Sequence, residues 1–492
     1  MKKGLFLFVL VMTGLAAASC RSSFFGGDMP PAPAAPPPPP VSVDGIRTSY
    51  ADVVERTSPA VVRITAESRS SANPHQFPFG GDDFFRQFPI PRAEPPGPQL
   101  QRGLGSGVLV SADGTILTNN HVVEGAQKIT VQMSDDKTFE AKIVGSDKPS
   151  DLAVLKIEAQ NLPFLNLGNS DTVRVGDIVL AIGNPLGIGQ TVTAGIISAK
   201  GRRTGLSDGT SFQDFLQTDA PINRGNSGGA LVNLNGELIG INSQILSPGG
   251  PNGGNIGIGF AIPSNMAKSV LEQLLANGRV RRGMLGVNIQ DLTADTAKAL
   301  GMPDTVGVLV SNVKGGSAAD KAGIKRRDVI VAVNGEKIED SNALRNKIAN
   351  SAPGSEVKLR IVRDGKEQEL TATLDELDSD VAQNAGPGDN GQVPGDGGQN
   401  GKLGLGLQPL TPQTARQLGL SDADGMVVTE VSPSGAAAEA GIERGDVLLE
   451  VNGRSVKTAD DVRAALDAGA GRPALLLISR RGQTIYVTVT PQ

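Results

Sequence analysis

Residues 224–229 read Arg-Gly-Asn-Ser-Gly-Gly, which sets Ser227 among three glycines just before an apolar run that begins at Ala230. Glycine lets the backbone turn sharply, so such a turn exposes the serine hydroxyl and aims successive N–H groups at one point. Taken alone, a run of this kind is usually only a turn. It indicates a nucleophile when the chain also offers a base and a carboxylate that could act on the same hydroxyl.

The chain contains only two histidines that could be this base. His75 lies in a stretch rich in proline and phenylalanine, a poor place for a side chain that must be held in one position. His121 lies in Thr-Asn-Asn-His-Val-Val (residues 118–123), at the end of an expected strand. Asp151 stands directly before the apolar run 152–157, where a carboxylate would be partly buried and would need a partner. The chain order His121, Asp151, Ser227 is that of chymotrypsin-type proteases.

Proton transfer gives each of these residues an expected role. A serine hydroxyl is a weak nucleophile until a neighbouring base accepts its proton. His121 would accept the proton and then give it to the leaving amine. Asp151 would hold the imidazole tautomer and stabilise the imidazolium. The backbone N–H groups of Gly225, Asn226 and Ser227 are the candidates for the oxyanion hole, and those of Gly225 and Ser227 are favoured.

The sequence around these residues has the pattern of short β-strands. Asp113-Gly114 and Asn235-Gly236 each lie between two apolar runs, which is a strong signal for a tight hairpin. Further apolar runs occupy 152–157, 178–182 and 192–197, and the spacing of apolar residues predicts a helix at 266–275. Many short strands with frequent turns predict a mostly β fold, as a barrel or a sandwich.

The last third of the chain is a duplication. Residues 322–335 recur at 440–453, an offset of 118 residues that also holds for neighbouring stretches. A period this long indicates two copies of a domain rather than solenoid repeats. Residues 378–400, between the copies, are mostly Gly, Asp, Asn, Gln and Pro, and as a flexible coil would span about 25 Å. We therefore expect the second copy to be loosely tethered.

The N-terminus reads as an export signal. Two lysines precede an apolar run that ends in small residues before Cys20, so residues 1–19 are expected to be a signal peptide and 20–42 a Pro-rich tether. The cleavage region resembles a bacterial lipobox, although Ala17 stands where a large apolar residue is usual. Two interpretations stay open: a protein anchored to a membrane by lipid on Cys20, or an ordinary cleaved signal with an incidental cysteine.

Composition excludes several other classes of function. The 46 basic and 51 acidic residues give a net charge of −5, without the basic field that drives nucleic-acid binding. One cysteine and two histidines exclude most zinc sites, and no P-loop motif is present. The sequence therefore supports no cofactor, no metal and no nucleic-acid partner.

The active-site stretches 118–123, 150–156 and 225–230 resemble the three motifs of the HtrA (Deg, or Do-like) serine endoproteases, and the match runs from about Tyr50 to the C-terminus. The resemblance implies a chymotrypsin-like double β-barrel protease domain at 43–276, followed by two α+β PDZ domains at 277–377 and 401–492. The irregular stretch 68–101 falls where this family carries its regulatory loop. Whether its phenylalanines pack on their own domain or on another subunit stays open.

The same resemblance implies partners and binding residues. It suggests ATP-independent cleavage of misfolded or unfolded envelope proteins in the periplasm, by homo-oligomers that are trimers or multiples of them. Ser243, Gln244 and Ile245 would pair with substrate backbone, and the stretch from Leu246 to Ile258 would line a pocket for Val, Ile or Ala. Hydrophobic C-terminal peptides would bind the PDZ domains through backbone N–H groups. The expected carboxylate loops are Met284, Leu285, Gly286 and Val287 in the first copy and Lys402, Leu403, Gly404 and Leu405 in the second.

Two other classes of function remain as alternatives. One is a holding chaperone with an idle triad, and the other is a non-enzymatic PDZ scaffold at the envelope. A complete set of His121, Asp151 and Ser227 argues against either as the sole function.

Overall fold

The computed structural model describes residues 42–43, 46–47, 49–69, 100–184, 189–204, 211–223, 225–246, 254–377, 403–418, 424–469 and 473–490. The expected signal peptide, Cys20, most of 68–101, the 378–400 linker and Lys402 lie outside these residues. The chain divides into two units, 1–49 and 50–492. In the first, β1 (Ser42–Val43) pairs antiparallel with β2 (Ile46–Arg47). No helix within the described ranges is long and apolar enough to cross a membrane.

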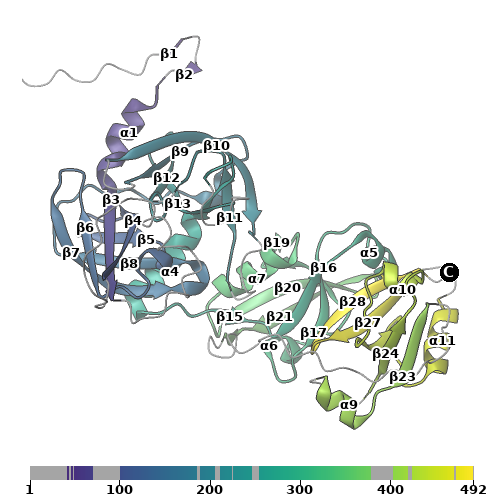
Figure 1. Cartoon of the computed structure of the whole chain (residues 1–492). Helices are drawn as coiled ribbons and strands as arrows, with labels where there is room; N and C mark the ends of the chain where they lie inside the picture. Colours follow the sequence, from purple (N-terminus) through teal and green to yellow (C-terminus); the bar gives the residue numbers. More distant parts are fainter. Residues whose placement is uncertain are drawn as a thin grey trace, which may run out of the picture. The chain divides into compact units, whose positions relative to one another are not determined.

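The second unit begins with a closed β-barrel (Figure 1). After α1 (Ala51–Thr57), the barrel strands follow in the spatial order β3-β4-β5-β8-β7-β6. Their bounds are β3 (Val61–Arg69), β4 (Leu100–Leu109), β5 (Thr115–Thr118), β6 (Lys128–Gln132), β7 (Thr138–Asp147) and β8 (Leu152–Ile157). The hairpin predicted at Asp113-Gly114 is confirmed, since β4 and β5 pair across it and Gly114 takes a positive φ of 94°.

A second closed barrel follows, with the spatial order β10-β11-β14-β13-β12-β9. Its strands are β9 (Ile178–Gly183), β10 (Thr191–Arg202), β11 (Phe215–Thr218), β12 (Ala230–Asn233), β13 (Leu238–Ile245) and β14 (Gly259–Pro263). The Asn235-Gly236 hairpin joins β12 to β13, as predicted. The predicted helix is α4 (Ser264–Asn277), whose buried residues Val270, Leu271 and Leu274 join the apolar cluster shared by both barrels. The expected double barrel is confirmed.

The two C-terminal copies have the same sheet, which confirms the duplication. In each copy one edge of the sheet is formed by the strand that follows the expected carboxylate loop, β16 in the first copy and β23 in the second. The first contains β15 (Gly283–Met284), β16 (Val287–Asp291), α5 (Ala294–Leu300), β17 (Val308–Val313), α6 (Ala318–Lys321), β18 (Val329–Val333), β19 (Glu336–Lys337), α7 (Ser341–Asn350), β20 (Glu356–Arg363), β21 (Lys366–Thr373) and β22 (Asp375–Glu376). The second contains β23 (Leu405–Pro409), α9 (Pro412–Gln417), β24 (Met426–Val431), α10 (Ala436–Glu439), β25 (Val447–Val451), β26 (Arg454–Ser455), α11 (Ala459–Asp467), β27 (Ala474–Arg480) and β28 (Gln483–Val489).

Each copy also holds one buried ion pair at an equivalent place. In the first copy, Asp328 is fully buried and accepts two hydrogen bonds of 2.7 Å from the guanidinium of Arg363. In the second, Asp446 accepts bonds of 2.8 and 2.6 Å from Arg480. The hydrogen bonds that each arginine donates to its carboxylate raise the pKa of the arginine. The pair is part of the domain that was duplicated.

The expectation of a loosely tethered second copy is wrong for the described residues, because the two copies pack against each other. The side-chain amide of Gln290 donates to the Tyr486 carbonyl at 3.0 Å and accepts from the Tyr486 N–H at 2.7 Å, as a neighbouring strand would. Arg326 forms an ion pair with Glu450 at 3.2 Å. A shared apolar cluster combines Leu292, Leu309 and Val329 of the first copy with Leu475, Leu477 and Tyr486 of the second.

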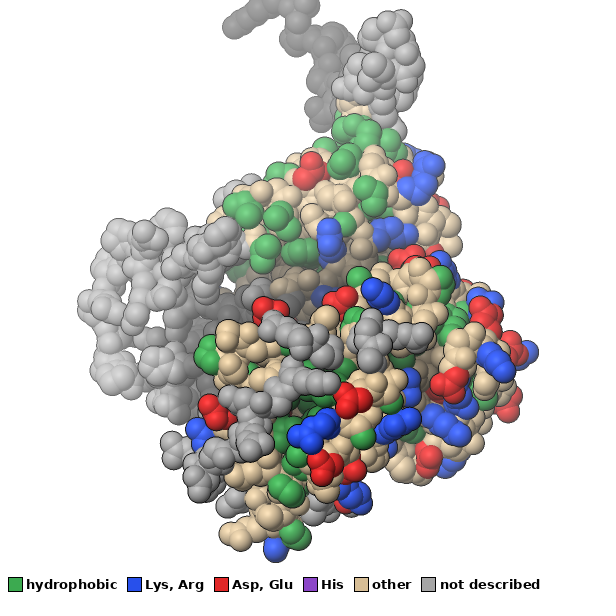
Figure 2. All heavy atoms as spheres, turned by 90° about the vertical axis from the view of Figure 1, so that its right-hand side faces the viewer, with side chains coloured by type: hydrophobic (Ala, Val, Ile, Leu, Met, Phe, Trp, Pro, Cys, Tyr) green, Lys and Arg blue, Asp and Glu red, His purple; other side chains and the backbone are tan. Residues whose placement is uncertain are grey.

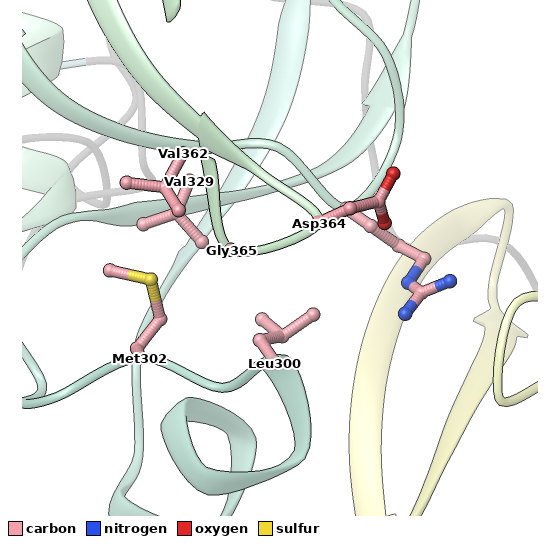
Figure 3. Close-up of a pocket in the computed structure, with 7 residues that line it drawn as sticks. Leu300, Met302, Val329, Val362, Asp364 and Gly365 are labelled. Carbon is pink, nitrogen blue, oxygen red and sulfur yellow. The ribbon is translucent and has the colours of Figure 1, made fainter. Parts of the chain in front are cut away.

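A small pocket adjoins this interface. Leu300, Met302, Val329 and Val362 line it, with Asp364, Gly365 and Arg327 completing the wall (Figure 3). On the face shown in Figure 2, basic and acidic side chains are interspersed over the described surface. This mixture agrees with the nearly balanced charge of the sequence.

The first copy also contacts the double barrel through buried polar groups. Arg282 pairs with Asp147, at the end of β7, by bonds of 2.8 and 2.5 Å, and both side chains are buried. The Phe212 ring lies 4.6 Å from the Arg282 guanidinium and 4.8 Å from that of Arg345. Asn342 of α7 donates to the Gln213 carbonyl at 2.9 Å. These contacts join the first copy to segments next to the candidate site.

Candidate active site

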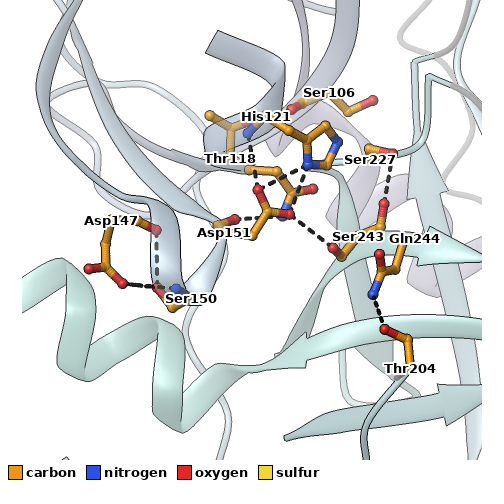
Figure 4. A network of polar contacts seen from close by, with 11 residues as sticks. Ser106, Thr118, His121, Asp147, Ser150, Asp151, Thr204, Ser227, Ser243 and Gln244 are labelled. Carbon is orange, nitrogen blue, oxygen red and sulfur yellow. Dashed lines mark hydrogen bonds and ion pairs between the residues drawn. The ribbon is translucent and has the colours of Figure 1, made fainter. Parts of the chain in front are cut away.

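The first part of the site is a histidine–carboxylate pair in the first barrel. His121 lies in the short helix α3 (Asn120–Val123) directly after β5, and Asp151 lies directly before β8. Because β5 and β8 pair antiparallel, with Thr118 opposite Ala153, the end of one strand meets the start of the other. His121 Nδ1 is 2.8 Å from one Asp151 carboxylate oxygen and 3.0 Å from the other (Figure 4).

The backbone around this pair fixes the direction of the carboxylate. Asp151 adopts the left-handed conformation, with φ 55° and ψ 42°. Its carboxylate also accepts the backbone N–H of His121 at 3.0 Å, and its main-chain carbonyl accepts the side chain of Asn119 at 3.0 Å. The carboxylate therefore holds both the ring and the backbone of the histidine.

The electrostatics of His121 favour the imidazolium. Burial lowers the pKa of the ring, but the Asp151 charge and hydrogen bond, with a smaller contribution from Glu124, outweigh burial and raise the pKa above its usual value. A base with a raised pKa accepts a proton more readily from a hydroxyl.

Ser227 lies in the turn between β11 and β12, in the second barrel. In the view of Figure 4 the His121 ring lies between Asp151 and Ser227. The Ser227 hydroxyl donates to the Ser243 carbonyl at 2.8 Å, and no hydrogen bond joins it to His121 in the part of the chain that the structure describes. The hydroxyl must therefore turn from Ser243 toward the ring before His121 can accept its proton.

Two of the three expected oxyanion donors stay available. Asn226 N–H donates to the Asn223 carbonyl at 3.0 Å, which removes it from the candidates and corrects that expectation. The N–H groups of Gly225 and Ser227 have no hydrogen-bond partner among the described residues. Gly225 takes a φ of 95°, a region that only glycine enters readily.

The expected substrate strand is the end of β13. Strand β12 begins at Ala230, which pairs with Ile241 of β13. The last three residues of β13, Ser243, Gln244 and Ile245, therefore extend past the start of β12 toward the nucleophile turn. On its other side this segment pairs with β14, and Leu246 N–H donates to the Ile258 carbonyl at 3.2 Å. Leu246 is 39 % exposed. Residues 247–253 of the expected pocket lie outside the described residues.

The two expected carboxylate loops are built alike. Gly286 and Gly404 both have positive φ, at 80° and 72°. The Gly286 carbonyl accepts from Lys314 N–H at 2.9 Å, and the Gly404 carbonyl accepts from Ser432 N–H at 2.8 Å. A Cβ at Gly286 would lie 2.3 Å from that of Ser317, so the loop has no room for a side chain there. The described part of the first loop also contains Met284, Leu285 and Val287, and Val287 is the first residue of β16. The described part of the second loop also contains Leu403 and Leu405.

The structure adds two residues that sequence analysis did not single out, Glu124 and Ser106, and a second role for Ser243. Ser243, which was expected to act through its backbone, also donates its hydroxyl to Asp151 at 3.1 Å. Glu124 contributes to the electrostatics of His121. Ser106 lies in β4 and is fully buried, and its backbone N–H donates to the Ser227 carbonyl of the nucleophile turn at 2.8 Å. Only Ser106 carried a signal, since it lies in Gly-Leu-Gly-Ser-Gly, and glycines inside a strand mark a close approach of backbone.

The arrangement is suited to acyl transfer by a serine. A carboxylate holds a histidine of raised pKa, a hydroxyl lies on the far side of the ring, and two N–H groups adjoin that hydroxyl. The described residues contain no group of three or more His, Cys, Asp or Glu that could hold a metal ion.

Comparison with known proteins gives matches along most of the chain. Residues 105–241 match the trypsin-like peptidase domain, and residues 283–374 and 427–480 match PDZ domains. The chain is 41 % identical over 463 residues to a probable periplasmic serine endoprotease, DegP-like, of Chlamydia muridarum, which covers 90 % of this chain and 88 % of the relative. It is 40 % identical over 455 residues to a probable periplasmic serine protease, do/HhoA-like, of Haemophilus influenzae, which covers 90 % and 92 %.

Solved structures agree with these relatives. The structure of the HtrA-type protease AlgW with a decapeptide is 42 % identical, covers 67 % of this chain and 99 % of its own, and has a TM-score of 0.52. The structure of AlgW with a tripeptide is 41 % identical, covers 67 % and 98 %, and has a TM-score of 0.54.

Proposed function

The chain belongs to the HtrA/DegP family of serine endoproteases, and from that premise we propose that it cleaves misfolded or unfolded proteins of the bacterial envelope, without ATP, through an acyl-enzyme on Ser227. The observation that carries the proposal is the His121–Asp151 pair at 2.8 Å, with Ser227 across the ring. The fold supplies the hydroxyl, the base and the carboxylate that this chemistry needs.

The reaction begins when the Ser227 hydroxyl leaves the Ser243 carbonyl and turns toward His121. His121 takes the proton as the oxygen attacks the scissile carbonyl, and Asp151 stabilises the imidazolium that results. The N–H groups of Gly225 and Ser227 bind the oxyanion. His121 then protonates the leaving amine, and a water molecule activated by the same ring releases the acyl group.

Substrate enters as an added strand. We assign Ser243, Gln244 and Ile245 to backbone pairing, because this end of β13 has no β12 partner on the side of the nucleophile. Only extended chains can pair in this way, so the proposal favours unfolded polypeptides over folded ones. The half-exposed Leu246 and the exposed Ile256 supply apolar surface near this strand for an aliphatic side chain before the cut.

The PDZ domains are assigned to capture hydrophobic C-terminal peptides at the Met284–Val287 and Lys402–Leu405 loops. A link to the active site is available, since Arg282 of the first PDZ domain pairs with Asp147. The same Asp147 carboxylate accepts the N–H of Ser150, the neighbour of Asp151, at 3.1 Å. We propose that peptide capture regulates cleavage through this contact, and that the domains also hold unfolded chains without cleaving them.

Location and assembly are proposed from the relatives and the sequence. The relatives are named periplasmic enzymes, and the N-terminus of this chain has the features of an export signal. We propose a periplasmic homo-oligomer, a trimer or a multiple of trimers, anchored to a membrane through Cys20. Recovery of all wild-type protein in the soluble periplasmic fraction would contradict the anchor and leave the enzymatic proposal intact.

Ser227→Ala tests the function. It removes one hydroxyl from a turn that glycines shape, so the variant should fold and bind unfolded casein but not cleave it. Cleavage at a near wild-type rate would overturn the proposal.

A further inference from the structure

Ser106 joins the two barrels at the point where the nucleophile turn begins. It lies in β4 of the first barrel and is fully buried. Its hydroxyl donates to the Gly225 carbonyl at 2.6 Å and accepts the Asn184 N–H at 2.8 Å. Its main chain is held as well, because its N–H donates to Ser227 O and its carbonyl accepts the Thr118 hydroxyl at 2.7 Å.

The direction of the Ser106 hydroxyl is fixed by its partners. A serine hydroxyl has one proton and can accept through its lone pairs. Since the Asn184 N–H can only donate, the hydroxyl accepts there and its single proton goes to the Gly225 carbonyl. The Ser106 hydroxyl is therefore a donor of known direction, aimed at one peptide group of the nucleophile turn.

That peptide group lies between the two N–H groups assigned to the oxyanion. The Gly225–Asn226 peptide is held at both ends, its carbonyl by Ser106 at 2.6 Å and its N–H by the Asn223 carbonyl at 3.0 Å. Rotation of this plane would change the angle between the N–H of Gly225, before it, and that of Ser227, after it. Gly225, at φ 95°, has no side chain of its own to resist such a rotation.

The strand that contains Ser106 packs closely against the nucleophile turn. A Cβ on Gly228 would lie 2.1 Å from the Ser106 carbonyl oxygen, and a Cβ on Gly105 would lie 3.3 Å from Ser227 O. The strand and the turn are thus in direct backbone contact. Removing the hydroxyl would leave the buried Gly225 carbonyl and the half-buried Asn184 N–H without this partner.

We propose that Ser106 is a positioning residue, whose hydroxyl orients the Gly225–Asn226 peptide so that the N–H groups of Gly225 and Ser227 converge on the oxyanion. The inference rests on the proposed serine-protease function and adds a residue that touches neither substrate nor His121. It acts on stabilisation of the transition state rather than on substrate binding, because the substrate strand β13 is held by β14 instead.

The test compares Ser106→Ala with Ser264→Ala in the full-length protein. Ser264 is a matched control, since it is also fully buried and donates its hydroxyl to a glycine carbonyl, that of Gly168, at 2.7 Å. With a short fluorogenic peptide, Ser106→Ala should lower kcat about tenfold and leave KM within about twofold. Ser264→Ala should leave both within about twofold, although each variant loses one buried hydrogen bond.

A peptide boronic acid gives the decisive readout, because its tetrahedral adduct places an oxygen where the oxyanion forms. Its affinity should fall in Ser106→Ala by the same factor as kcat/KM, while the acid limb of the pH profile stays in place. An unchanged kcat, a change in KM alone, or an unchanged boronate affinity would each overturn the inference.

Two further measurements separate the possible failures. If Ser106→Ala does not fold, Ser106→Cys retains the packing with a weaker donor, and its kcat should lie below that of the wild type. If Ser227→Ala still cleaves, the proposed function fails. Only the positioning role fails if Ser227→Ala is inactive while both Ser106 variants have the kcat of the wild type.

Discussion

At the scale of single residues, the site depends on a backbone conformation that few side chains tolerate. Asp151 sits at φ 55°, in the left-handed region, where Asn and Asp are enriched among residues other than glycine. The local turn thereby directs the carboxylate back onto both the ring and the N–H of His121. The residue at this position must therefore satisfy the backbone as well as the chemistry.

Asp151→Asn separates these two requirements. Asparagine also tolerates the left-handed region, so the variant should keep the thermal midpoint of the wild type within a few degrees. Its amide cannot stabilise an imidazolium or hold the required tautomer, so kcat should fall about 10³–10⁴-fold. Asp136→Asn is the control, because Asp136 has a φ of 64° in the exposed turn between β6 and β7 and has no hydrogen bond to His121 or Ser227 among the described residues, so the variant should keep full activity. Comparable kcat in both variants would count against the role of Asp151.

The pH profile follows from the raised pKa of His121. Because the ring must be neutral to act as base, kcat/KM should fall as the pH drops through that raised pKa, above the usual value of about 6.5. Glu124 raises the pKa of His121, so Glu124→Gln should move this acid limb to lower pH, and the shift should shrink in high salt. Lys148 pairs with Glu124 at 3.0 Å, so Lys148→Gln should move the limb the other way. If both variants moved the acid limb of the pH profile in the same direction, the effect of Glu124 on the pKa of His121 would be contradicted.

At the scale of elements, local signals predicted most of what the structure contains. The Asp-Gly and Asn-Gly turns located two hairpins, the apolar spacing located α4, and the repeat located both C-terminal sheets. The long-range contacts could not be predicted. Ser106 meets Gly225 across 119 residues, and Gln290 meets Tyr486 across 196, through side chains whose partners depend on how separate sheets pack.

The repeated ion pair is such a contact, and its effect on stability can be measured. Asp446 is buried, and Asp446→Asn would leave the Arg480 guanidinium partly buried without its carboxylate. The free energy of unfolding of the second PDZ domain should fall by about 3 kcal/mol. Asp460→Asn breaks an exposed pair with Arg463 in the same domain and should change it by less than about 1 kcal/mol. Hydrogen exchange of β25 and β27 measures both, and equal effects would refute a structural role for the buried pair.

At the scale of the whole molecule, the second PDZ domain is a packing partner of the first. Its edge strand β28 is bonded by Gln290, and its Leu475 and Leu477 cover Leu309 and Val329. The composition of the linker led to the expectation of a loosely tethered domain. Linker composition could not predict this packing, because a flexible connection says nothing about whether the two connected domains contact each other.

Deletion of residues 401–492 should therefore have two separate effects. Basal cleavage of a short peptide should change little, because both barrels and the site residues precede residue 277. The first PDZ domain should lose hydrogen-exchange protection in β16 and β17, since its apolar cluster becomes exposed. Deletion of everything after residue 276 should also abolish stimulation by hydrophobic C-terminal peptides. Unchanged protection in the shorter deletion would show that the interface contributes no stability.

We propose that a single hydroxyl, that of Ser227, performs the chemistry after His121 accepts its proton. Covalent labelling of the full-length protein by a fluorophosphonate, followed by peptide mapping, tests it most directly. We expect one labelled residue, Ser227, with labelling lost in Ser227→Ala and greatly slowed in His121→Ala. Labelling of a different serine, or undiminished labelling of Ser227→Ala, would contradict it.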